Sequence, residues 1–97
     1  MISAKIRQFA PLILGNIEGL NYTKTNLKLA LETQNYKIKD VCFGDGFKFI
    51  KIKDSNTIEC SKWSYNKNDW ENLILTLDEF WNKTKHRKNQ ILIIKNE

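Results

Sequence analysis

The feature that most constrains the fold is a stripe of six large apolar side chains between residues 68 and 85. These side chains recur at intervals of three and four residues, which is the spacing of one face of an α-helix. Asn68 stands where it would cap the first turn, and Glu71, three residues later, would complete a capping box. The pattern predicts one long amphipathic helix over residues 68–85. Its apolar stripe consists of Trp70, Leu73, Ile74, Leu77, Phe80 and Trp81.

Upstream of this helix, residues 36–65 have the pattern of β-strands. Polar and apolar side chains alternate over residues 36–43, 47–53 and 57–65. Turn-forming glycine, aspartate, serine and asparagine residues separate these segments. We therefore expect consecutive strands joined as antiparallel hairpins.

The length of the second loop determines which side chains share a face of the sheet. A loop of three residues after Lys53 pairs Lys51 with Glu59 and Phe47 with Trp63. The resulting apolar face consists of Ile50, Ile52, Ile58 and Cys60. A two-residue loop would mix lysine and glutamate with these apolar side chains, so we expect the three-residue loop.

Three other segments complete the predicted fold. Residues 2–14 have helical spacing but contain Pro11, which ends or kinks a helix. Residues 25–33 fit either a strand or a helix, and we favour a strand because the segments that follow are strands. The continuous apolar run of residues 91–94 is typical of a strand that is covered on both faces.

The predicted fold class is therefore α+β. It comprises a short N-terminal helix, an antiparallel four-stranded meander that includes residues 25–33, one long amphipathic helix packed on the sheet, and a short C-terminal strand. A chain of 97 residues has room for one hydrophobic core, so we expect residues 1–97 to form a single domain.

The chain is basic, with a formal net charge of +5 that is spread along its length. Of its 16 basic residues, all except Arg7 and Arg87 are lysines. Specific reading of base edges favours the planar fork of arginine. A lysine-rich chain therefore favours nucleic-acid contacts that do not depend on sequence.

Missing sequence features constrain the compartment and the chemistry. Cys42 and Cys60 show no CxxC spacing, so we expect two reduced thiols in a cytoplasmic protein. No apolar run approaches the roughly 18–20 residues of a membrane span, and Pro11 interrupts the N-terminal run that a signal peptide would need. His86 is the only histidine, so we expect no metal site. No catalytic or cofactor-binding motif is present, and we expect a protein that is not an enzyme.

The second face of the predicted hairpin carries the strongest functional signal. It interleaves aromatic side chains with lysines, an arrangement that binds single-stranded nucleic acid by stacking bases and neutralising phosphates. The predicted binding residues on this face are Phe47, Phe49, Lys51, Lys53 and Trp63, extended by Tyr65. Lys85, Arg87 and Lys88 would form a second anchor for phosphates. Alternatively, this face is a second core layer that the N-terminal helix covers.

Three functions fit these patterns. The first is non-specific binding of single-stranded DNA or RNA. The second is binding to another protein, as in an inhibitor or immunity-type protein of a phage or another mobile element. Small size, the lack of a catalytic motif and a composition rich in lysine, asparagine and isoleucine support this second function. The third is a winged-helix DNA-binding protein, which requires residues 25–33 to be helical.

Overall fold

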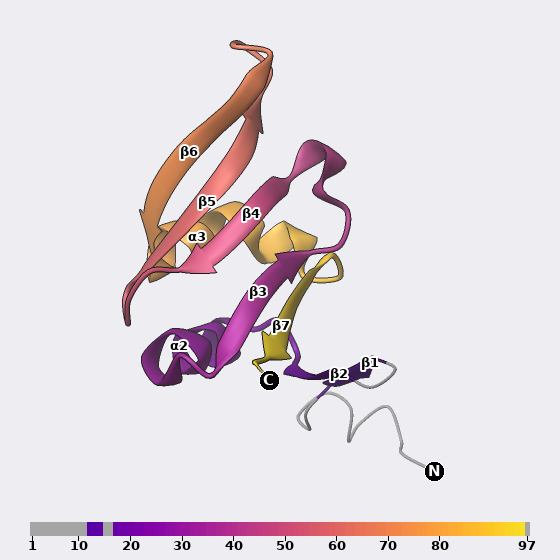
Figure 1. The fold of residues 1–97 in the computed structure, drawn as a ribbon, viewed down its shortest axis with the longest axis vertical. Coiled ribbons are helices and arrows are strands. Elements are labelled where there is room, and N and C mark those ends of the chain that lie inside the picture. Colours follow the sequence, from indigo (N-terminus) through magenta and orange to yellow (C-terminus); the bar gives the residue numbers. More distant parts are fainter. Residues whose placement is uncertain (1–11, 15–16, 97) are drawn as a thin grey trace.

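The computed structural model describes residues 12–14 and 17–96, which form strands and helices in an α+β arrangement, as predicted (Figure 1). The strands are β1 (Leu12–Leu14), β2 (Ile17–Leu20), β3 (Tyr36–Asp40), β4 (Phe47–Ile52), β5 (Thr57–Ser64), β6 (Asp69–Thr76) and β7 (Ile91–Lys95). The α-helices are α2 (Lys24–Thr33) and α3 (Leu77–Thr84), and the short 3-10 helices are η1 (Phe43–Asp45) and η2 (Lys85–Arg87).

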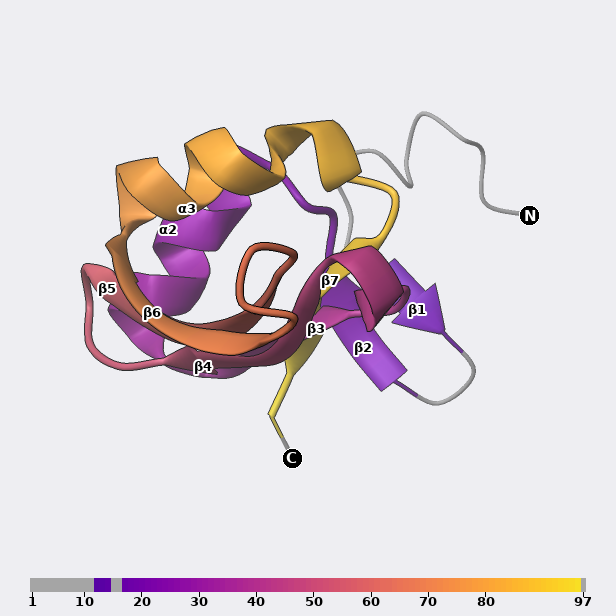
Figure 2. The ribbon, with the colours of Figure 1, turned by 90° about the horizontal axis from the view of Figure 1, so that it is seen from above.

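The described strands form two antiparallel sheets. One sheet has the order β1-β2-β7-β3 and the other has the order β4-β5-β6. β3 and β4 lie side by side where the two sheets meet, and the β4-β5-β6 sheet curves around α2 and α3 (Figure 2). The four-stranded meander that we predicted is wrong, because β3 pairs with the distant β7 and residues 24–33 are not a strand.

Residues 24–33 form the helix α2. The Thr23 hydroxyl accepts a hydrogen bond from the Asn26 amide and caps the first turn. The buried side chains of α2 are Leu27, Ala30 and Leu31, at helical spacing. The alternating leucines suggested a strand, but the segment consists mainly of strong helix formers and helix propensity prevailed. β3 follows α2 directly, so residues 24–40 form no helix-turn-helix.

The long helix that we predicted over residues 68–85 is wrong in its first half. Residues Asp69–Thr76 form β6, which pairs with β5 along its whole length, and α3 begins only at Leu77. The Thr76 hydroxyl accepts from the Glu79 amide, and the Glu79 carboxylate accepts from the Thr76 amide. Large apolar residues of the strand β6 and of the first turn of α3 follow each other in the sequence. Together they happen to lie three and four positions apart, as they would on one helix.

The predicted register of β4 and β5 is confirmed over most of its length. Lys51 lies opposite Glu59 and Phe49 lies opposite Ser61, as a three-residue loop requires. The face predicted to be apolar contributes to the core through Ile50, Ile52, Ile58 and Cys60. Loop length and side-chain alternation therefore determined the pairing of these two strands.

A β-bulge changes the position of Phe47. The register shifts between Phe47 and Phe49, so Phe47 lies opposite Lys62 and not opposite Trp63. An extra residue in one strand reverses the side to which the neighbouring side chain points. Phe47 is therefore only 1% exposed, and its ring centroid lies 5.3 Å from that of Phe80 in the core. Phe47 therefore does not belong to the face of Phe49, Lys51 and Trp63, to which we assigned it.

The predictions for the two ends of the chain have different outcomes. The C-terminal strand is confirmed as β7, in which Ile91 and Ile93 are fully buried. Of the helix predicted over residues 2–14, residues 2–11 lie outside the described part of the chain, and Leu12–Leu14 form β1. Neither α2 nor α3 is long and apolar enough to span a membrane.

Candidate nucleic-acid interface

The β4-β5-β6 sheet has one side against the core and another side that points away from α2 and α3 (Figure 2). We call this second side the outer face. Strand alternation and the observed pairing assign its members. They are Phe49 and Lys51 on β4, Glu59, Ser61 and Trp63 on β5, and Trp70, Asn72 and Ile74 on β6. Neither described α-helix covers this side of the sheet.

Aromatic side chains line the outer face from Phe49 to the tip of the β5–β6 hairpin. Phe49 is 64% exposed, and Tyr65 at the tip is 73% exposed. Between them, Trp63 and Trp70 lie directly opposite each other, with ring centroids 5.4 Å apart and an interplanar angle of 77°. Edge-to-face contact stabilises such a pair. Both tryptophans are half-buried, so part of each ring remains open to solvent.

Lysines border these aromatic rings along β4. Lys48, Lys51 and Lys53 are all exposed. Lys48 Nζ lies 5.4 Å from the centroid of the Phe49 ring and 5.5 Å from that of the Trp70 ring. Both distances are short enough for cation–π attraction. The outer face therefore brings cations and aromatic rings into direct contact.

Like Lys48, two further lysines of this surface were missed in the sequence, namely Lys37 and Lys39 on β3. They alternate with the buried Ile38 and Asp40, so both point to solvent from the strand beside β4. In the described part of the chain, neither these two lysines nor the three between residues 48 and 53 form an ion pair. Glu59, opposite Lys51, is the one carboxylate among the outer-face residues named above, so these five exposed lysines form a positive strip that attracts anions.

Trp70 and Ile74 were also missed on the outer face, because the prediction placed them on a helix. The segment between β5 and β6 is rich in asparagine, which favours turns. Asn68 adopts a φ of 53°, a left-handed conformation that asparagine tolerates. Interpreted as a hairpin turn, this segment predicts Trp63 and Trp70 as cross-strand neighbours.

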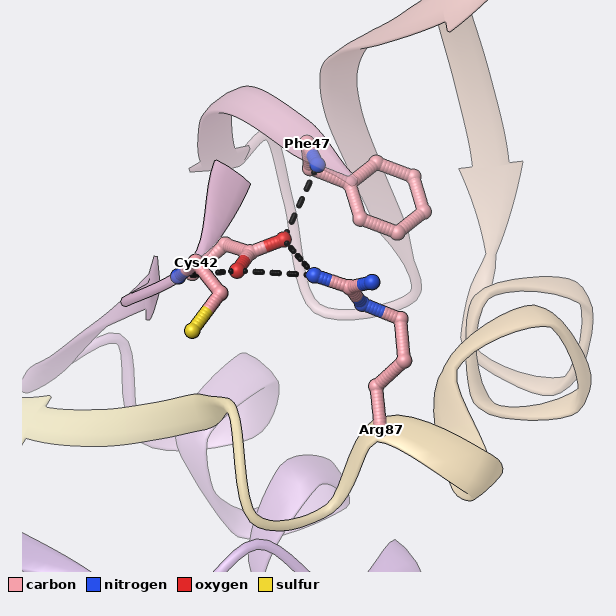
Figure 3. Close-up of polar contacts among 4 residues, drawn as sticks. Cys42, Phe47 and Arg87 are labelled. Atoms are coloured by element: carbon pink, nitrogen blue, oxygen red, sulfur yellow. Dashed lines mark hydrogen bonds and ion pairs between the residues drawn. The ribbon is translucent and has the colours of Figure 1, made fainter. Parts of the chain in front are cut away.

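Arg87, which we predicted as a phosphate anchor, is engaged in a buried ion pair (Figure 3). Its Nη2 donates to both carboxylate oxygens of Asp40, at 3.0 and 2.7 Å, and the two side chains are 11% and 0% exposed. The same carboxylate accepts from the amides of Cys42 and Phe47, each at 2.9 Å. A Cβ atom on Gly46 would clash with this carboxylate and with the Arg87 guanidinium, so glycine at this position lets the ion pair keep its geometry. Arg87 thus ties η2 to the turn between β3 and β4.

The other two predicted anchors, Lys85 and Lys88, are exposed. The segment that carries them follows α3 directly and lies on the helix side of the β4-β5-β6 sheet (Figure 2). The structure therefore does not bring them together with Phe49, Lys51 and Lys53.

Burial removes two titratable groups from surface chemistry. It raises the pKa of Tyr22 to about 12, although the Tyr22 hydroxyl is hydrogen-bonded to Thr84. It also raises the pKa of the Cys60 thiol to about 11. Both cysteines are free, and Cys42 is exposed. Within residues 12–14 and 17–96, no three histidine, cysteine, aspartate or glutamate side chains gather as a metal site requires.

No protein-family model, curated protein sequence or solved structure matches this chain.

Proposed function

We propose that this protein is a non-enzymatic module that binds single-stranded DNA or RNA on its outer face, without sequence preference. The observation that supports this most strongly is the exposure of Phe49 beside exposed lysines that form no ion pair in the described part of the chain. An exposed aromatic ring among unpaired cations is stabilised by a ligand that covers the ring and neutralises the charge. The free thiols of Cys42 and Cys60 support a reducing, cytoplasmic location.

Base stacking explains the aromatic part of the outer face. Bases stack on flat aromatic side chains whatever their identity, because every base has a π-face. Phe49 provides one such surface. The pair formed by Trp63 and Trp70 provides a second, one strand repeat or about 7 Å nearer the hairpin tip. The bases of a single strand can reach both surfaces, whereas the bases of a duplex are stacked on one another.

The lysines explain recognition of the phosphate backbone. Lys51 follows Phe49 on β4, Lys53 lies directly after this strand, and Lys37 and Lys39 widen the positive strip on β3. An ammonium group neutralises a phosphate without the fixed fork geometry of arginine. We therefore expect binding that depends strongly on salt and weakly on base sequence.

Phe49→Ala is the most direct test of this proposal. Wild-type protein should bind fluorescein-labelled oligo-dT and oligo-U, with fluorescence anisotropy showing tighter binding at low salt. Loss of the Phe49 ring should weaken binding about 5- to 150-fold, because one stacked base contributes about 1–3 kcal/mol. Phe43→Ala is the matched control, since Phe43 is also exposed but lies in η1, outside the outer face.

The control variant should bind like the wild type. Equal losses in the Phe43 and Phe49 variants would place the binding surface elsewhere. Failure of the wild type to bind either oligonucleotide at low salt would refute the proposal.

The exposure of Ile74 supports a second candidate function. Ile74 is 58% exposed on the outer face, and an aliphatic side chain gains from burial against a protein but cannot bind a phosphate. We therefore propose binding to a protein partner, including an inhibitor or immunity-type role, as the alternative. A pull-down from source lysate before and after nuclease treatment distinguishes the two. A partner that survives nuclease and is lost with Ile74→Ser supports the alternative.

A further inference from the structure

Lys48 covers aromatic surface that a stacked base would need. Its Nζ lies 5.4 Å from the centroid of the Phe49 ring and 5.5 Å from that of the Trp70 ring. In a regular strand, Lys48 and Phe49 would point to opposite sides of the sheet. The β-bulge between Phe47 and Phe49 removes this constraint, so the Lys48 side chain reaches the outer face.

A base and the Lys48 ammonium compete for the same space. Both ring contacts of Lys48 fall within the distance of about 6 Å at which an aromatic ring attracts a cation. A stacked base must lie flat against a ring at van der Waals distance. Stacking on the ring faces that Lys48 contacts therefore requires Lys48 to move. Because Lys48 is exposed on a flexible four-carbon stem, a ligand can displace it.

The group that the Lys48 ammonium contacts after displacement determines which ligands bind more tightly. A neutral aromatic compound would remove two favourable contacts and return the ammonium to water. A nucleotide carries a phosphate beside its base, so the ammonium can exchange the rings for an anion. We infer that Lys48 closes the stacking surface in the free protein and opens it to rings that bear an adjacent anion. The inference rests on the proposed function, and it makes the ligand class nucleotides in preference to neutral aromatic compounds.

Lys48→Met tests this inference, with Lys51→Met as the matched control. Both changes remove one exposed lysine of β4, but only Lys48 contacts the two rings. Affinity for oligo-dT is measured over a range of salt concentrations and extrapolated to about 1 M salt, where phosphate attraction is weak. Each variant should reduce the slope of log K against log salt by up to about 0.7.

The two variants should differ in the extrapolated affinity. At about 1 M salt, Lys48→Met should bind oligo-dT about two- to fivefold more tightly than wild type, because its rings are already uncovered. At the same salt concentration, Lys51→Met should bind oligo-dT with the affinity of the wild type. A thymine peptide nucleic acid, which has bases without phosphates, should likewise gain about two- to fivefold from Lys48→Met alone.

Tryptophan emission of the free protein tests the ring contact independently. Lys48→Met should change the emission, because Trp70 loses the cation beside it. Lys48→Arg, which keeps a cation over the rings, and Lys51→Met should leave the emission as in wild type. An unchanged thermal unfolding midpoint shows that each variant is folded.

The failures of the two proposals can be distinguished. If wild type binds oligo-dT but Lys48→Met and Lys51→Met have equal affinity at about 1 M salt, the inference is wrong and the proposed function stands. Unchanged emission in Lys48→Met would also overturn the inference. If wild type does not bind oligo-dT at low salt, the proposed function fails and the inference fails with it.

Discussion

The ion pair of Asp40 and Arg87 joins two residues that are 47 positions apart. The carboxylate is fully buried and also accepts hydrogen bonds from the amides of Cys42 and Phe47. A buried carboxylate without partners is unfavourable, so these contacts determine the shape of the turn that precedes β4. The β-bulge that brings Lys48 onto the outer face lies directly beyond this turn.

Arg87→Met should therefore destabilise the fold strongly. It leaves the Asp40 carboxylate buried without a cation, which lowers the free energy of unfolding by about 3–5 kcal/mol. Lys88→Met removes the neighbouring positive charge from an exposed position. This variant should change the free energy of unfolding by less than about 0.5 kcal/mol. Urea denaturation measures both. Similar small effects would show that the ion pair contributes little to stability.

Among the elements, the β5–β6 hairpin extends the outer face toward one end of the molecule (Figure 1). A two-stranded hairpin by itself is only marginally stable in water. Here β4 pairs with β5, and the rings of Trp63 and Trp70 pack against each other across the two hairpin strands. Cross-strand aromatic pairs stabilise a sheet beyond simple burial. The tryptophan pair thus stabilises the hairpin while it contributes to the outer face.

The boundary between β6 and α3 depends on a helix cap. Thr76→Ala removes the acceptor of the Glu79 amide and should lower the free energy of unfolding by about 1 kcal/mol. Glu79→Gln keeps a side-chain acceptor for the Thr76 amide, so its free energy of unfolding should be closer to that of the wild type. Urea denaturation compares the two variants. No loss of stability in Thr76→Ala would contradict a role of this cap in starting α3.

Across the whole molecule, Tyr22 connects the segment before α2 to α3. Its hydroxyl is hydrogen-bonded to Thr84, and its ring centroid lies 5.3 Å from that of Trp81. Tyr22 and Thr84 are both buried. On the surface, Lys24 and Asp78 link the same two regions, but an exposed ion pair contributes little to stability. The buried Tyr22 therefore contributes more than this ion pair to holding the two regions together.

The protein should lose stability at alkaline pH because of Tyr22. Burial raises the pKa of Tyr22 from 10.0 to about 12, so the phenol ionises more readily in the unfolded chain. Its contribution is complete below about pH 10 and is lost between about pH 10 and 12. The difference in pKa corresponds to about 2.7 kcal/mol. In urea denaturation at several pH values, Tyr22→Phe should remove this part of the pH dependence.

An identical alkaline profile for Tyr22→Phe and wild type would show that ionisation of Tyr22 is not responsible for the loss of stability.

Some of these features were predictable because they depend on residues that are close in the chain. Alternation and loop length predicted the pairing of β4 with β5, and with it that Phe49 and Lys51 lie on the face opposite Ile50 and Ile52. The prediction of a helix over residues 68–85 failed because a strand followed by a helical turn can imitate helical spacing. Trp70 was consequently missing from the candidate site.

The sequence by itself determined the α+β class, the strands around the 54–56 loop, and the placement of Phe49 and Lys51 on one face of that hairpin. Short-range alternation suffices for each of these. Only the tertiary structure decided that Phe47 lies in the core, that Arg87 pairs with Asp40, and that Lys48 covers two rings. The physical reason is that a bulge, a buried charge and a ring contact each depend on neighbours in space. The periodicity of a single segment does not specify those neighbours.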